Sequence, residues 1–74
     1  MYQIKIYNKT DNTWIEAVTV PFIPEDGDYY PFTCPYCGYP RLLIIRKEDV
    51  GKKIPFECKC GKEYVLIVEG EENE

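Results

Sequence analysis

The sequence predicts a small all-β domain that depends on a metal ion for part of its stability. With 74 residues the chain forms one domain, below the size at which a hydrophobic core alone comfortably stabilises a fold. Short apolar or alternating runs are separated by turn residues, and no stretch shows the helical period. All four cysteines fall within two similar short phrases, residues 31–38 and 55–61, which indicates a shared metal site.

The N-terminal part of the chain predicts a β-hairpin. Residues 2–7 alternate polar and apolar side chains, residues 8–13 form a polar turn cluster, and residues 14–20 are a second β-rich run. We expect Trp14 to lie in the core of this hairpin, because so small a chain needs its rings for burial. Residues 21–31 carry proline, glycine and several acidic side chains, which is typical of a loop.

The second half of the chain predicts three further short elements of β-structure. Residues 42–45, Leu-Leu-Ile-Ile, predict a largely buried strand. Residues 50–53 turn the chain back, and residues 54–56 lead into the second cysteine pair. Residues 64–68 are apolar and β-branched enough to form the last strand.

The domain organisation follows from these elements. We expect a single domain over residues 1–68, with the hairpin at 1–20, the cysteine-bearing part at 31–68, and a disordered acidic tail at 69–74. No basic and apolar leader opens the chain, and no run approaches the roughly 18 apolar residues of a membrane span. We therefore expect a cytoplasmic protein with reduced thiols and no membrane partner.

The cysteines are arranged as two ligand pairs. A Cys pair separated by one or two residues can place both sulfurs on one side of a tight turn, and two such turns supply four tetrahedral ligands. Gly38 and Gly61 directly follow the pairs, where such turns need a positive φ that glycine adopts without strain. The predicted metal ligands are Cys34, Cys37, Cys58 and Cys60.

The predicted metal is one structural Zn²⁺. Four soft thiolates with no histidine anywhere in the chain make a closed site, whereas catalytic zinc needs an open position, so we expect no enzyme activity and no small-molecule substrate. Phe32 and Phe56 each stand two residues before a first cysteine and are expected to keep water from the metal. The alternative is two disulfides or four free thiols, although a Cys58–Cys60 bond would be strained.

The pattern Cys-Pro-Tyr-Cys-Gly, a strand, a turn, a second strand ending in Phe-Glu-Cys-Lys-Cys-Gly, and a third strand resembles the zinc ribbon, from Pro31 to Val68. The first phrase is most similar to the transcription elongation factor 1 family, whereas the second knuckle is C-x-C where those families usually have C-x-x-C. The resemblance implies a three-stranded antiparallel sheet, here with an added N-terminal hairpin. It also implies a non-enzymatic adaptor that contacts a protein assembly or a nucleic acid in transcription.

Charge and aromatic residues give the only indication of a partner. Between Arg41 and Lys62 there are seven basic and three acidic residues, although the whole chain has a net charge of −4. These cations either contact phosphate or a protein, or simply solvate an exposed turn. We expect the aromatic side chains near the first cysteine pair mostly to pack around the metal. The candidate contacts are Arg41, Arg46, Lys47, Lys52 and Lys53, and the aromatic group is Tyr29, Tyr30, Phe32, Tyr36 and Tyr39.

Two other functions remain open at this point. The segment Cys37-Gly38-Tyr39 also resembles rubredoxin, which implies iron held by four thiolates and electron transfer, although the rubredoxin second knuckle is normally C-P-x-C-G. Cys34 and Cys37 could alternatively cycle as a redox pair, but the helix and βαβ unit typical of that chemistry are missing from the pattern.

Overall fold

The computed structural model describes residues 1–70 and shows an all-β fold, as the sequence predicts. One short 3₁₀ turn is the only helical element among these residues, and none of their helices is long and apolar enough to cross a membrane. The elements are β1 (Tyr2–Asn8), β2 (Thr13–Val20), β3 (Asp28–Thr33), β4 (Pro40–Ile45), η1 (Lys47–Asp49), β5 (Lys53–Glu57) and β6 (Glu63–Gly70).

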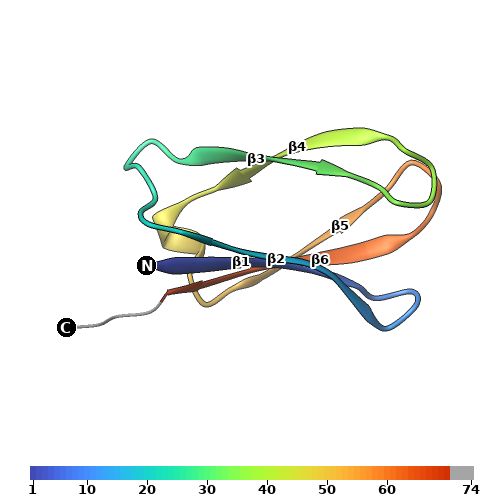
Figure 1. Cartoon of the computed structure of the whole chain (residues 1–74), viewed down its shortest axis with the longest axis horizontal. Coiled ribbons are helices and arrows are strands. Elements are labelled where there is room, and N and C mark those ends of the chain that lie inside the picture. The colour runs from blue at the N-terminus through green and yellow to red at the C-terminus, as the bar shows by residue number, and fades with distance from the viewer. Residues whose placement is uncertain (71–74) are drawn as a thin grey trace.

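The strands form two layers (Figure 1). One layer is a four-stranded sheet with the order β2-β1-β6-β5, and the other is the two-stranded β3–β4 layer. All neighbouring strands are antiparallel. The N-terminal hairpin is confirmed, and because β1 also pairs with β6 from Tyr2↔Gly70 to Asn8↔Tyr64, the hairpin is half of the main sheet rather than an attachment to it.

The grouping of the later strands differs from the three-stranded ribbon that was predicted. Strand β4 does not join β5 and β6, but pairs with β3, which occupies the end of the segment predicted as a loop. Residues 28–33 include three aromatic side chains, Tyr29, Tyr30 and Phe32, and this β-forming content outweighs Pro31. Proline is tolerated there because β3 has a neighbour on one side only.

One further boundary moves. Residues predicted as the start of the acidic tail, Glu69 and Gly70, are the last two residues of β6, where pairing with β1 holds them in the sheet. The rest of the predicted tail, residues 71–74, lies outside the described part of the chain.

The hydrophobic core lies between the two layers. Alternate residues of β1 and β6 point into it, as the period of a strand requires, and the β3–β4 layer covers them from the other side. In β4 only Leu43 and Ile45 are buried, whereas Leu42 and Ile44 are exposed, so the prediction of a largely buried strand is wrong for half of it. A two-stranded outer layer has only one face against the core.

Most of the aromatic side chains expected in the core are on the surface. Trp14 is 60% exposed, because the register Tyr7↔Trp14, next to an irregularity of the β1–β2 pairing, puts both rings on the outer face of the sheet. Their centroids are 4.9 Å apart in an edge-on contact. Of the group near the first cysteine pair, Phe32 alone is fully buried, Tyr30 is half-buried, and Tyr29, Tyr36 and Tyr39 are exposed.

Two adjacent leucines test this layer arrangement. We expect Leu43→Ala to lower the free energy of unfolding by about 2–5 kcal/mol, because it leaves a cavity between the layers. Leu42→Ala, the matched control, should change it by no more than about 0.5 kcal/mol, because that side chain faces outward. Urea unfolding at low micromolar protein concentration measures both free energies. Equal losses in the two variants would contradict the orientation of β4.

Candidate metal centre

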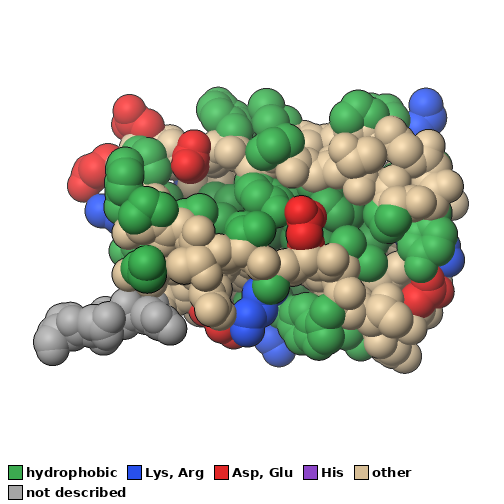
Figure 2. All heavy atoms as spheres, in the orientation of Figure 1, with side chains coloured by type: hydrophobic (Ala, Val, Ile, Leu, Met, Phe, Trp, Pro, Cys, Tyr) green, Lys and Arg blue, Asp and Glu red, His purple; other side chains and the backbone are tan. Residues whose placement is uncertain are grey.

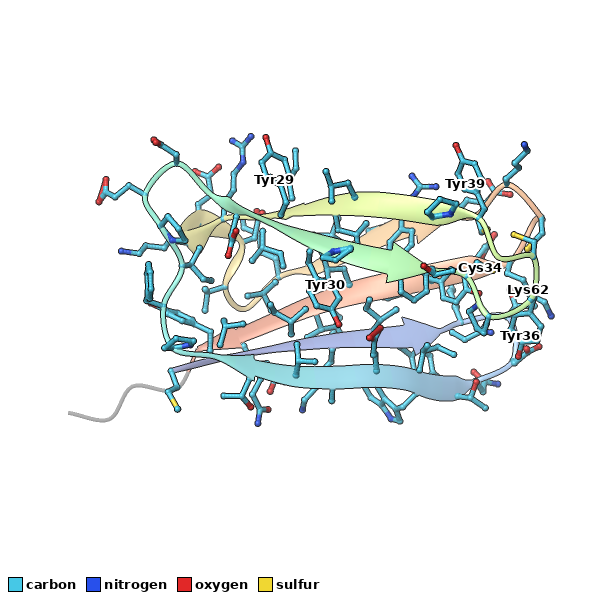
Figure 3. All side chains as sticks on the ribbon, turned by 45° about the horizontal axis from the view of Figure 1, so that its top comes forward. Tyr29, Tyr30, Cys34, Tyr36, Tyr39 and Lys62 are labelled. Atoms are coloured by element: carbon cyan, nitrogen blue, oxygen red, sulfur yellow. The ribbon has the colours of Figure 1, made fainter. Side chains whose placement is uncertain are left out.

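The two cysteine pairs lie in turns at the same end of the two layers. Cys34 and Cys37 are in the turn between β3 and β4, and Cys58 and Cys60 are in the turn between β5 and β6. One pair therefore comes from each layer. Figure 3 shows the sulfur atoms beside Cys34, where these turns meet.

The sulfur atoms are spaced as a tetrahedral metal site requires. All four Sγ atoms lie within 4.8 Å of one another, with Cys34–Cys60 at 3.8 Å and Cys37–Cys58 at 3.4 Å. Metal–sulfur bonds of about 2.3 Å in a tetrahedron place the sulfurs about 3.8 Å apart, so the donor set fits one ion. A disulfide needs about 2.05 Å, and all four cysteines are free in this structure. The predicted convergence of the cysteines is confirmed.

The first knuckle is a tight turn closed by two backbone hydrogen bonds. The Gly38 N–H donates to the Cys34 carbonyl over 2.8 Å, and the Cys34 N–H donates to the Tyr39 carbonyl over 3.2 Å. Gly38 has φ of +74°, which places it in the left-handed region that glycine tolerates best.

The second knuckle repeats this arrangement with one residue fewer. The Gly61 N–H donates to the Cys58 carbonyl over 2.9 Å, and the Cys58 N–H donates to the Lys62 carbonyl over 2.8 Å. Gly61 has φ of +97°. The second turn has one residue fewer between its cysteines than the first turn. It nevertheless forms the same two closing backbone hydrogen bonds.

The thiols are not equivalent in their acidity. Burial raises the pKa of the Cys34 thiol, but hydrogen bonds from the Tyr64 hydroxyl and from the Cys37 and Tyr36 amides outweigh it and bring the pKa down to about 6. At Cys37 a hydrogen bond from the Tyr39 amide lowers the pKa, whereas the hydrogen bond with Cys58 and burial outweigh that and raise it to about 11. A cation is what allows such close sulfurs to ionise together.

Tyr64 supports the site from inside the core. Its hydroxyl lies 3.1 Å from Cys34 Sγ, and burial together with this hydrogen bond raises the pKa of Tyr64, which keeps the hydroxyl protonated as a donor. Phe32 and Phe56 pack against its ring, with centroids 5.2 and 5.5 Å away. In the sequence, the pattern around Tyr64 predicts only a strand residue. The available signal was a tyrosine at a buried position, since its hydroxyl needs a partner there.

Asp11 connects both knuckles from outside. Its carboxylate accepts hydrogen bonds from the Tyr36 hydroxyl over 2.6 Å and from Lys62 Nζ over 3.3 Å. Tyr36 lies within the first knuckle and Lys62 follows the second, and Figure 3 shows them side by side. The hydrogen bond from Tyr36 lowers the pKa of the Asp11 carboxyl. The β1–β2 turn therefore connects the two cysteine-bearing turns, which no sequence motif indicates.

The predicted partner contacts do not form one patch. Arg41 is half-buried, lies 5.3 Å from the Phe56 ring centroid and donates to the Glu57 carbonyl over 2.8 Å, so it braces β4 against β5. Arg46 and Lys47 border an open depression that also holds Glu25, Asp26 and Glu48.

The two remaining lysines lie elsewhere. Lys52 is exposed in the turn after η1, where its N–H donates to the Asp49 carbonyl. Lys53 is on β5 and lines a shallow depression together with Tyr7, Lys9 and Trp14. The five candidate cations therefore do not line one common depression.

Removing the Tyr64 hydroxyl tests its role at the sulfurs. We expect Tyr64→Phe to weaken metal affinity by about 10–100-fold, because it keeps the ring and loses the donor to Cys34. The pKa of Cys34 in the metal-free protein should rise, since its thiolate loses a hydrogen bond. Chelator competition and the pH dependence of thiol alkylation measure these effects. Tyr30→Phe, which loses a hydrogen bond to Glu16 away from the sulfurs, is the control. Equal metal affinity and equal pKa of Cys34 in Tyr64→Phe and Tyr30→Phe would contradict the role of the Tyr64 hydroxyl at the sulfurs.

No family model, curated protein or solved structure matches the chain. The resemblance to zinc ribbons thus stays a prediction that the cysteine motifs alone support. The fold and the four-sulfur cluster are compatible with a small metal-binding module.

Proposed function

We propose that this protein is a non-enzymatic adaptor domain, in which one structural Zn²⁺ holds together a surface that docks on a protein assembly. The observation that carries the proposal is the four-sulfur cluster, in which no Asp or Glu of residues 1–70 joins the cysteines. Four thiolates fill a tetrahedral shell and leave no position for water or substrate. Such a site supports folding rather than chemistry.

Zinc is the proposed metal, and iron is the alternative with the same ligands. Four thiolates in a tetrahedron suit both ions. The second knuckle, Cys58-Lys59-Cys60, departs from the C-P-x-C-G expected of a rubredoxin-like iron site. Absorption spectroscopy distinguishes the structural zinc site from the electron-transfer iron site, because iron bound to thiolates absorbs visible light and zinc does not.

A protein is the proposed partner rather than a nucleic acid. The net charge is −4, and the candidate cations are dispersed, with Arg41 engaged between strands and Arg46 within 3.9 Å of Glu48. A nucleic-acid interface requires a concentrated basic surface. Large apolar side chains are exposed instead, which suits contact with a protein. The resemblance to transcription-associated zinc ribbons makes a transcription assembly the first partner to examine.

Metal analysis and one cysteine variant test the structural role. We expect the purified protein to be colourless, to hold one zinc per chain, and to lose cooperative unfolding on chelation or in Cys58→Ser, because a structural zinc contributes on the order of 10 kcal/mol. Thr33→Ser, at an exposed position beside Cys34, should unfold like the unaltered protein. Inductively coupled plasma spectrometry and thermal unfolding provide the measurements. Stoichiometric iron with visible bands, or a native melting temperature in Cys58→Ser, would contradict the proposal.

Fluorescence anisotropy with labelled oligonucleotides tests the class of partner. We expect no saturable binding of single- or double-stranded oligonucleotides at micromolar protein and about 150 mM salt, because the cations are dispersed. The informative variant carries Lys52→Glu and Lys53→Glu. Tight binding that weakens with salt and disappears in this variant would replace the protein partner by a nucleic acid.

A further inference from the structure

Each cysteine turn presents one exposed and one buried thiol. Cys37 and Cys60 are exposed, whereas Cys34 and Cys58 are buried. The two exposed cysteines line one open depression, to which both turns contribute. This end of the molecule, at the right of Figure 2, faces solvent, and its visible side chains are a mixture of hydrophobic and charged ones. A small solute in water therefore reaches one sulfur of each turn directly.

Each exposed sulfur lies beside a buried sulfur of the other layer. Cys60 Sγ is 3.8 Å from Cys34 Sγ, and Cys37 Sγ is 3.4 Å from Cys58 Sγ. A redox-sensitive cysteine is typically accessible to solvent and close to a second cysteine that resolves its oxidised form. The cluster contains that arrangement twice. In both pairs, the accessible sulfur and its resolving partner belong to different layers.

Bond formation within the second turn is disfavoured. Only one residue separates Cys58 from Cys60, so a disulfide between them would be strained. If both oxidise without bonding to each other, each bonds to a cysteine of the first turn. The sulfur contacts select Cys34 for Cys60 and Cys37 for Cys58. Complete oxidation therefore links the β3–β4 layer to the four-stranded sheet at two points.

We propose that a peroxide converts the four cysteines from metal ligands into two disulfides, Cys34–Cys60 and Cys37–Cys58, which release the metal ion and keep the two layers joined. The inference rests on the proposed zinc site, because the ion loses its thiolate donors when the sulfurs pair. The protein then has two cross-linked states, one held by metal in a reducing environment and one held by disulfides in an oxidising environment. Oxidation releases a zinc ion and leaves the fold intact.

One molecule of hydrogen peroxide accounts for each disulfide. The accessible thiolate attacks one peroxide oxygen, the O–O bond breaks, hydroxide leaves, and the sulfur becomes a sulfenic acid. The buried thiolate of the other layer then attacks that sulfur, which forms the S–S bond and releases a second hydroxide. Each thiolate loses one electron, and two protons from solvent convert the hydroxides to water. A dithiol reductant reverses the step by thiol–disulfide exchange and restores the thiolates for zinc.

Peroxide oxidation of the full zinc-loaded chain tests the proposal. About two equivalents of hydrogen peroxide should release one zinc per chain, measured with a metal-binding dye, and remove four hydrogens relative to the mass of the reduced, metal-free chain. The oxidised protein should still unfold cooperatively, whereas the reduced protein stripped of metal by a chelator, the matched control, should not. A dithiol reductant with added zinc should restore the starting state. Unfolding on oxidation, or zinc release without disulfides, would overturn the proposal.

Peptide mapping of the oxidised chain shows which sulfurs pair. Trypsin cleaves after Lys59, between the cysteines of the second turn, and chymotrypsin cleaves after Tyr36, between those of the first turn. Digestion of the unfolded, alkylated chain therefore puts each cysteine in a separate peptide. We expect each peptide of the first turn to be joined to one of the second turn, in the two pairs proposed above. A bond within either turn, or the opposite pairing between the turns, would overturn the proposal.

Trapping with dimedone, which reacts with sulfenic acids, gives an independent readout. At substoichiometric peroxide we expect adducts on Cys37 and Cys60, the exposed sulfurs. Labelling mainly of Cys34 and Cys58 would contradict the proposed order of attack. Metal analysis of the reduced protein tests the proposed function separately. Iron in place of zinc contradicts that function, whereas the disulfide map decides the present proposal with either metal.

Discussion

The convergence of four thiols at one end of the molecule is the constraint on which the rest of the fold depends. The cysteine turns come from different layers, so the sulfur cluster closes the end of a sandwich whose upper layer has only two strands. Sulfurs within 4.8 Å of one another do not all ionise unaided, as the pKa of about 11 at Cys37 indicates. A cation that neutralises them therefore joins the layers as well as the turns.

The surrounding polar contacts hold this end of the molecule from two sides. Tyr64 donates to Cys34 from the core, and Asp11 binds Tyr36 and Lys62 from the surface. Tyr64 comes from β6 and Asp11 from the β1–β2 turn, so every hairpin within residues 1–70 reaches the cysteine cluster or its turns. The N-terminal hairpin, which lies outside the zinc-ribbon pattern, consequently positions the ligands rather than standing apart from them.

The features that the sequence predicts well are local. The ligand turns depend on the spacing of the cysteines and on glycine φ angles, and both can be recognised within a few residues. Strand pairing is not local, because the apolar pattern of residues 42–45 is compatible with pairing to either β3 or β5. Pro31 is also typical of a loop, so the pattern of residues 28–33 does not indicate a strand. The position of Trp14 depends on a pairing irregularity between Ile6 and Tyr7, and the Asp11 contacts depend on three separate segments. None of these has a periodic signature.

The thin upper layer links the proposed metal site to the exposed apolar residues. Two strands cannot bury both of their faces, and a two-stranded ribbon is marginally stable on its own. The cysteine cluster lies at the end of β3, and Arg41 braces β4 against β5, so the layer keeps its shape without a cover on its outer face. Leu42 and Ile44 can then remain exposed without being needed for folding. A fold held in this way does not need its outer apolar residues for packing.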